Sequence, residues 1–144
     1  MIEKKFKKKI IIAGHPRAYR DKTRDFGGRK IVYNNTYKLI KNSHLVIAHD
    51  STSLNFACLL KKPVLLTYTD EMKKSSYLMN SILSFSEALG VKTINIDELT
   101  EKKIKINLKF NNKKYEEFIE NYITLSKSKK LSHEILEQKF SKFI

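Results

Sequence analysis

The sequence predicts an α/β fold in which a central parallel sheet is flanked by helices. Three observations lead to this prediction. Short apolar runs of strand length alternate with helical patterns along residues 8–96, and this order favours parallel strands joined by helical crossovers. The runs are continuously apolar, which is typical of strands buried on both faces. At 144 residues, the chain is long enough for one domain with a substantial core.

The strand prediction depends on short apolar runs that end at polar or turn-forming residues. The runs at 45–48 and 64–68 are the clearest, and Pro63 separates the second from the helix before it. Gly27 and Gly28 place a loop between the first two strands. We expect strands at residues 8–13, 30–33, 44–48, 64–68 and 93–96.

Helices are expected between these strands and after the last one. Thr36 is predicted to cap a short helix at 37–42. A helix at 71–88 carries apolar residues on or near one face, and Gly90 is its expected C-cap. The remaining helices are expected at 53–61, 112–124 and 132–140. The stripe of the helix at 112–124 consists of Tyr115, Phe118, Ile119 and Tyr122.

Charge is unevenly distributed along the chain, whose formal net charge is +14. Residues 1–40 carry 12 Lys/Arg and 3 Asp/Glu, residues 41–100 carry 6 and 6, and residues 101–144 carry 11 and 6. The neutral middle therefore holds most of the predicted core. The basic flanks suit an anionic membrane surface, a nucleic acid or a phosphorylated ligand. A genome-wide bias towards Lys, Ile and Asn explains the same composition without any specific partner.

Composition also limits the class of protein. No apolar run has the length of a membrane span, and the run that follows the basic N-terminus is too short for a signal peptide. We therefore expect a cytoplasmic protein, with peripheral contact to the inner membrane face as an option. The single cysteine, Cys58, lies among apolar residues and is expected to be an inert core thiol. A specific nucleic-acid-binding role is not expected, because no recognition motif is present.

The most informative stretch is 44–53, in which a buried strand ends at Ser51, Thr52 and Ser53 just before a helix. Hydroxyl groups, free backbone N–H groups and the positive end of a helix dipole together suit a phosphate. A second strand end carries His15 and Arg17. Because the carboxyl ends of parallel strands share one edge of a sheet, we expect both groups at one site. Thr67, at the end of the following strand, is a further candidate for nucleotide contact.

Structural roles compete with these interpretations. Ser51 and Thr52 could simply cap the following helix, which would contribute about 1 kcal/mol. Asp50 could orient His15 or His49, but a helix cap is the favoured role. The acidic residues are scattered along the sequence, so no metal site is predicted and a metal-independent mechanism fits better.

The order of these features resembles a known family. In sequence they are a strand, His15-Pro16, a loop with Gly27-Gly28-Arg29, Thr36 opening a short helix, a strand, Ser51-Thr52-Ser53, a helix, Lys62-Pro63-Val64 and a strand. This order is similar to the C-terminal half of GT-B fold glycosyltransferases, including bacterial sialyltransferases and polysialyltransferases of capsule and lipooligosaccharide synthesis. The similarity covers roughly residues 8–125.

This resemblance implies a Rossmann-like three-layer sandwich at residues 1–100 that binds a nucleotide sugar. Residues 101–144 would form a basic connection and C-terminal helices packed on the same domain. His15 would contact or protonate the donor phosphate, and Ser51, Thr52, Ser53, Arg17 and Thr67 would hold nucleotide or phosphate. The donor would be linked to CMP, UDP or GDP, and no other cofactor is expected. An N-terminal half would bind the acceptor. The alternative is a non-catalytic nucleotide- or phosphate-binding module or, as a less favoured choice, a basic nucleic-acid-binding domain.

Overall fold

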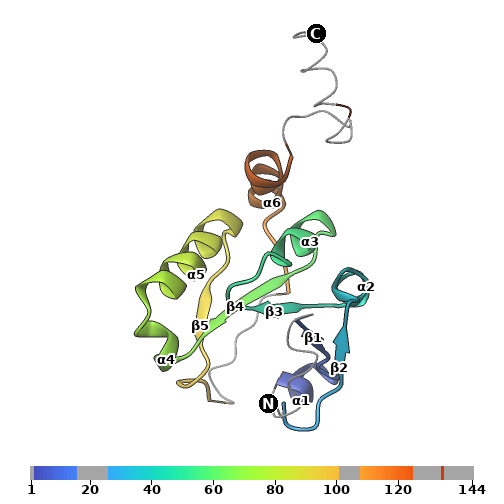
Figure 1. Ribbon diagram of the computed structural model, residues 1–144, viewed down its shortest axis with the longest axis vertical. Helices are drawn as coiled ribbons and strands as arrows, with labels where there is room; N and C mark the ends of the chain where they lie inside the picture. Colours follow the sequence, from blue (N-terminus) through green and yellow to red (C-terminus); the bar gives the residue numbers. More distant parts are fainter. Residues whose placement is uncertain (1, 16–25, 101–107, 125–133, 135–144) are drawn as a thin grey trace.

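The computed structural model describes residues 2–15, 26–100, 108–124 and 134. It is a mixed α/β structure whose parallel strands are flanked by helices, which confirms the predicted fold class. Figure 1 shows α5 beside the larger sheet and α3 above it, while α1 lies near β1 and β2. Of the helix expected at 132–140, only Glu134 lies among the described residues.

The strands form two small sheets rather than the single sheet expected from the sequence. β1 (Ile12–Gly14) pairs in parallel with β2 (Ile31–Tyr33). β3 (Val46–Ala48), β4 (Val64–Tyr68) and β5 (Thr93–Asn95) form a second parallel sheet in the order β3-β4-β5. The five predicted strands are thus present, but the expected continuous sheet edge is divided.

β1 is shorter than the strand expected at residues 8–13, and the structure gives a physical reason. The backbone N–H of Ile10 donates to the Glu3 carboxylate at 2.7 Å, so it does not join a strand ladder. Glu3 belongs to α1 (Ile2–Phe6), a short helix that the sequence analysis did not predict. At the other end of β1, a Cβ atom on Gly14 would overlap the Tyr33 ring, so close strand pairing requires glycine there.

The helix predicted at 71–88 is two helices, α4 (Asp70–Lys73) and α5 (Ser76–Leu89). Each has its own N-cap: Thr69 Oγ1 accepts from Met72 N at 3.1 Å, and Ser75 Oγ accepts from Leu78 N at 3.4 Å. These local hydrogen bonds satisfy helix-start donors at two places and therefore divide the apolar pattern. Gly90 ends α5 with φ +62°, as predicted.

The other helices follow the predicted order with local differences. α2 (Thr36–Asn42) begins at Thr36, so Asn35 and not Thr36 occupies the N-cap position, and no side chain caps the helix. α3 spans Leu54–Leu59. α6 (Asn112–Phe118) continues into a π-turn, η2 (Ile119–Ile123). Tyr122, in this turn, is 71% exposed, and its ring packs against Phe118 of the predicted stripe with ring centroids 5.1 Å apart.

The main core lies between the three-stranded sheet and the helices α3, α5 and α6. Leu66 of β4 is fully buried there against Leu54, Ile82 and Tyr115, among others. Tyr115 donates its hydroxyl hydrogen to the Lys62 carbonyl at 3.0 Å, which satisfies its polar end. Burial raises the pKa of Cys58 to about 12, and the predicted inert core thiol is confirmed as buried.

The opposite face of this sheet is covered less completely. Leu65 of β4 is 6% exposed on that face, whereas Ile47 of β3 and Ile96 after β5 are 38% and 46% exposed. α1 contributes Ile2 to a pocket beside Leu65. The two faces therefore differ: one holds a continuous core, and the other holds a partly open apolar surface. No helix in the described part of the chain is long and apolar enough to cross a membrane.

Candidate functional site

Polar residues follow all three strands of the larger sheet at their carboxyl ends. Ser51, Thr52 and Ser53 follow β3, and Thr69 and Asp70 follow β4. Asn95 ends β5, and Asp97 and Glu98 follow it within three residues. In parallel α/β sheets this edge is where ligands bind. The edge thus forms the candidate site, with hydroxyl groups at the β3 end and carboxylates at the β4 and β5 ends.

The residues Ser51, Thr52 and Ser53 form a compact hydroxyl turn. Ser51 Oγ lies 2.7 Å from Ser53 Oγ and accepts a hydrogen bond from Ser53 N at 3.2 Å. Thr52 is exposed, and its two neighbours are half-buried. Ser53 occupies the N-cap position of α3 without a side-chain cap hydrogen bond. Of the capping considered for Ser51 and Thr52, the structure shows a local form at Ser51, whose Oγ accepts from Ser53 N at the N-cap position of α3.

One of the features predicted to bind phosphate is absent from the start of α3. Free backbone N–H groups were expected there, and this prediction is wrong for residues 54–56. In the structure, these N–H groups already have acceptors. Those of Leu54, Asn55 and Phe56 each donate at 3.1 Å to the carbonyl three residues earlier, which belongs to the hydroxyl turn at 51–53. This tight turn uses the donors that an α-helix start would leave open. A phosphate at this turn would thus depend on the hydroxyl groups more than on helix-start amides.

Asp50 has neither of the roles considered for it. Its Oδ1 accepts a hydrogen bond at 2.8 Å from Ser81 Oγ on α5. This bond joins residues that are 31 positions apart and fixes the end of β3 to a helix that packs on the same sheet. Asp50 is therefore a positioning residue for the hydroxyl turn, which begins at the next residue.

The predicted partners of the hydroxyl turn are distributed differently from the expectation. His15 is exposed and directly follows β1, in the two-stranded sheet. The hydroxyl turn follows β3, in the other sheet, so the two candidate groups do not share a single sheet edge. Thr67 of β4 donates to the Ala48 carbonyl at 3.4 Å and lines the pocket on the weakly covered face. Arg17 lies outside the described residues.

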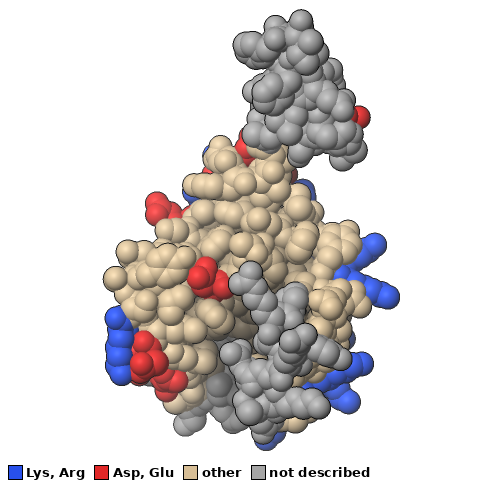
Figure 2. Space-filling model, in the orientation of Figure 1, with Lys and Arg blue, Asp and Glu red and all other residues tan. Residues whose placement is uncertain are grey.

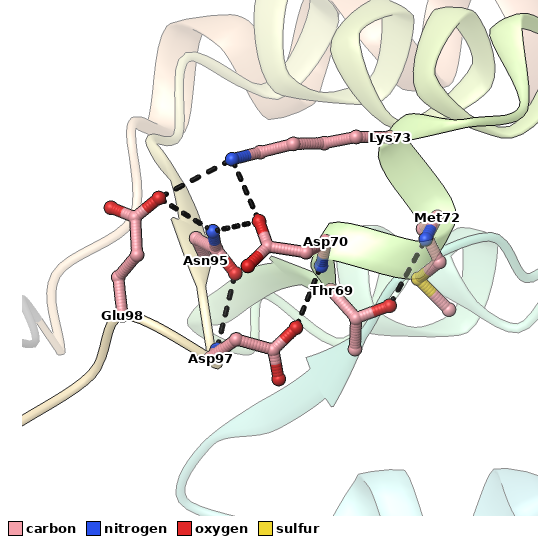
Figure 3. Close-up of polar contacts among 7 residues, drawn as sticks. All are labelled: Thr69, Asp70, Met72, Lys73, Asn95, Asp97 and Glu98. Atoms are coloured by element: carbon pink, nitrogen blue, oxygen red, sulfur yellow. Dashed lines mark hydrogen bonds and ion pairs between the residues drawn. The ribbon is translucent and has the colours of Figure 1, made fainter.

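The carboxylate end of the edge is a connected polar cluster, drawn in Figure 3. Asn95 Nδ2 donates to Asp70 Oδ1 at 2.9 Å and to Glu98 Oε1 at 2.8 Å. The Lys73 ammonium lies 2.9 Å from the same Asp70 oxygen and 3.3 Å from the same Glu98 oxygen. Asp97 Oδ2 accepts from Asp70 N at 2.7 Å. The cluster thus joins the start of α4 to the loop after β5.

Within the cluster, Asn95 is buried and the charged groups face solvent. Asn95 is 7% exposed, while the side chains of Asp70, Lys73 and Glu98 are 59%, 43% and 65% exposed. Figure 2 shows acidic and basic atoms side by side at the lower left, where Figure 1 places α4. The buried amide therefore orients carboxylates whose outer oxygens remain accessible. Such oxygens can accept hydrogen bonds from hydroxyl groups of a ligand, and they repel a phosphate.

Hydrogen bonding shifts the pKa values of these groups. Donation from Lys73 and Asn95 lowers the pKa of Asp70, and donation from Asn95 and Lys73 lowers that of Glu98. Hydrogen bonds to Asp70 and Glu98 raise the pKa of Lys73. The two carboxylates and the ammonium are therefore charged together across the neutral pH range.

This cluster was not predicted from the sequence. Its members Asp70, Asn95 and Glu98 are separated by as many as 28 positions, and the acidic residues were regarded as scattered. A signal was present, because acidic residues lie within two positions of the ends of two neighbouring predicted strands. In the described part of the chain, no group of three His, Cys, Asp or Glu side chains is arranged to hold a metal ion.

The pKa directions predict how the cluster contributes to stability at different pH. A lowered carboxyl pKa stabilises the fold above the unfolded value, about 4, and this contribution is lost as pH falls through the folded value. The raised Lys73 pKa acts in the opposite sense, and its contribution is lost as pH rises beyond the folded value. We expect Lys73→Gln to destabilise the protein only slightly at pH 7, because its ion pairs with Asp70 and Glu98 are exposed.

This expectation is tested by urea unfolding of both proteins at pH 7 and at about pH 3. The difference between them should shrink at the lower pH, where the carboxylates become protonated. Lys92→Gln is the control, since Lys92 is exposed and takes no part in the cluster. A difference that stays constant with pH would contradict a role for the two carboxylates.

The fold and the edge together define the class of protein: an α/β protein with parallel sheets and a polar site at the carboxyl ends of its strands. The comparisons with known proteins add no family to this class. The chain matches no protein-family model, no curated protein and no solved structure.

Proposed function

We propose that this chain is the nucleotide-sugar-binding half of a glycosyltransferase of the GT-B class, acting in bacterial surface polysaccharide synthesis. The observation that carries the proposal is the hydroxyl turn, which presents the exposed Thr52 between Ser51 and Ser53 at the carboxyl end of β3. This is the edge at which open parallel sheets bind ligands. In this proposal the acceptor is bound by a separate N-terminal half, and the protein acts in the cytoplasm, with the membrane surface nearby.

The distribution of charge along the edge supports one orientation of the bound nucleotide sugar. Hydroxyl groups at the β3 end can donate to a phosphate, and Asp50 is already occupied by Ser81. At the other end, Asp70 and Glu98 would repel a phosphate but can accept hydrogen bonds from ribose or sugar hydroxyls. We therefore place the donor phosphate at the hydroxyl turn and a hydroxyl-bearing part of the donor towards β4 and β5.

The proposed chemistry depends on charge that develops on the nucleotide phosphate as the glycosidic bond breaks. Hydroxyl donors already held in place by the turn can stabilise that charge without reorganisation. His15 is proposed to contact this phosphate or to protonate it, since an imidazole changes charge near neutral pH. For that role, His15 at the end of β1 must approach the hydroxyl turn when the donor is bound.

Calorimetry and thermal shift against CMP, UDP, GDP and their common sugar conjugates test the proposal. We expect saturable binding of one nucleotide class, with a rise in the melting temperature that depends on ligand concentration. The double variant Ser51→Ala/Thr52→Ala should weaken binding roughly 10- to 100-fold, because hydrogen bonds to a charged group are lost. Ser84→Ala, an exposed serine on α5, is the matched control and should bind as the wild type does.

The role of His15 is tested separately. His15→Ala should weaken binding of the nucleotide, while His44→Ala should not, because His44 is exposed and precedes the amino end of β3. Equal binding of a nucleotide with and without its sugar would favour the non-catalytic nucleotide-binding module. The proposal fails if none of the nucleotides binds, or if only salt-sensitive binding common to all polyanions is seen.

A further inference from the structure

A pocket of about 220 Å³ lies on the weakly covered face of the three-stranded sheet, opposite the main core. It is lined by Ile2, Ile10, Arg29, Leu65, Thr67, Ile94, Ile96 and Leu99. Its wall is thus aliphatic except for one guanidinium and one hydroxyl. An apolar cavity of about 150 Å³ in another protein holds benzene, so this pocket has room for a ring or a chain of about eight carbons.

The segment that covers the pocket is strongly basic. Ile2 and Ile10 line the pocket, and between them lie Lys4, Lys5, Lys7, Lys8 and Lys9, all exposed. Glu3 is the only acidic residue in this segment. Arg29 and Lys30, both exposed, add further positive charge beside the second strand. The apolar wall of the pocket and the basic segment beside it together favour a ligand that is apolar at one end and anionic at the other.

Arg29 is the cation placed at the pocket itself. Its Nη1 donates to the Phe26 carbonyl at 2.9 Å, and its Nη2 lies 3.3 Å from Glu3 Oε2. The side chains of Arg29 and Glu3 are 39% and 35% exposed, and ion pairs as exposed as this one are weak. Among the described residues, these contacts use two of the five guanidinium N–H donors. A ligand carboxylate or phosphate can therefore bind Arg29 beside Glu3 or in its place.

We propose that this pocket binds the short hydrocarbon part of an amphiphilic anion whose carboxylate or phosphate is held by Arg29. The ligand is an amphiphile that places one hydrocarbon chain in the pocket, either as a free molecule or as part of a membrane lipid. The proposal is independent of nucleotide binding, because the pocket lies on a face of the sheet and the hydroxyl turn lies at its edge.

Isoleucine methyl NMR tests the proposal with octanoate below its micelle concentration. We expect saturable shifts of the δ1 methyl groups of Ile2, Ile10, Ile94 and Ile96, which line the pocket. Ile40 and Ile82, in the opposite core, serve as internal controls and should not move. Octyltrimethylammonium, with a chain of the same length but a positive charge, should bind at least roughly tenfold more weakly. Scattered shifts, no saturation or equal binding of the cation would overturn the proposal.

Two variants test the charge of Arg29 separately from the structure of the basic segment at residues 2–10. Arg29→Gln should weaken octanoate binding roughly tenfold. Glu3→Gln keeps an oxygen to accept from Ile10 N but releases Arg29, so octanoate should bind at least as tightly as in the wild type. Weaker binding in Glu3→Gln would overturn the proposal even if Arg29→Gln failed to fold. Lys30→Gln is the control for loss of one positive charge.

Sedimentation with phosphatidylglycerol vesicles distinguishes the source of the amphiphile. Binding to vesicles that is lost in Arg29→Gln and kept in Lys30→Gln would support the site and indicate a membrane lipid. Octanoate binding without vesicle binding would support the site and indicate a free amphiphile.

Discussion

Leu66→Ala is expected to lower the free energy of unfolding by about 2 to 5 kcal/mol. Leu66 is fully buried at the centre of β4, where the helices on the main face of the sheet pack against it. Alanine would remove apolar contacts and leave a cavity that a close-packed core fills only partly. Since domains are typically stable by about 5 to 15 kcal/mol, this loss is a large fraction of the total.

Urea unfolding followed by circular dichroism measures this effect. Leu83→Ala is the matched control, because Leu83 lies on α5 and is 49% exposed. The same chemical change should there cost no more than about 1 kcal/mol. Equal effects of the two substitutions would contradict the position of the core between β4 and the helices.

Asn95→Asp is expected to destabilise the protein at pH 7 by about 3 kcal/mol, although the two side chains have nearly the same shape. The Asn95 amide donates to both Asp70 and Glu98. A carboxylate at position 95 would remove both hydrogen bonds and bring a third negative charge against the two already present. The main effect is therefore on the polar cluster and not on packing.

The pH dependence of this variant identifies the cause. Repulsion raises the pKa of the new carboxyl group in the folded state, so its protonated form is compatible with the fold. The destabilisation should therefore shrink as pH falls from 7 towards 4, in contrast to the simple loss of a hydrogen bond. Asn80→Asp on α5, where Asn80 is exposed, is the control. A pH-independent loss in Asn95→Asp would contradict repulsion within the cluster.

Local patterns in the sequence were sufficient to predict much of the fold. Apolar runs bounded by turn residues located all five strands, and β4 has the expected bounds of 64–68. Gly90 ends α5 because a residue with positive φ is required there. Where local prediction failed, a polar side chain changed the backbone hydrogen bonding: Ser75 begins a new helix, and Glu3 holds Ile10 outside the sheet.

The candidate site was predicted only in part, because its two ends depend on different kinds of information. The hydroxyl turn consists of neighbouring residues after an apolar run, so the sequence shows it directly. The carboxylate cluster requires Asp70 and Asn95, 25 positions apart, to meet at adjacent strand ends. Likewise, only the fold shows that Asp50 pairs with Ser81 and that His15 follows a different sheet from Ser51.

By itself, the sequence therefore determined the α/β class, the order of the strands and helices, the buried thiol and the hydroxyl turn. These features depend on the periodicity and capping of consecutive residues. The tertiary structure decided the division into two sheets, the partners of the buried Asn95 and the pocket beneath α1. Each of these depends on which distant segments are adjacent, and strand pairing and packing of the whole chain determine that adjacency.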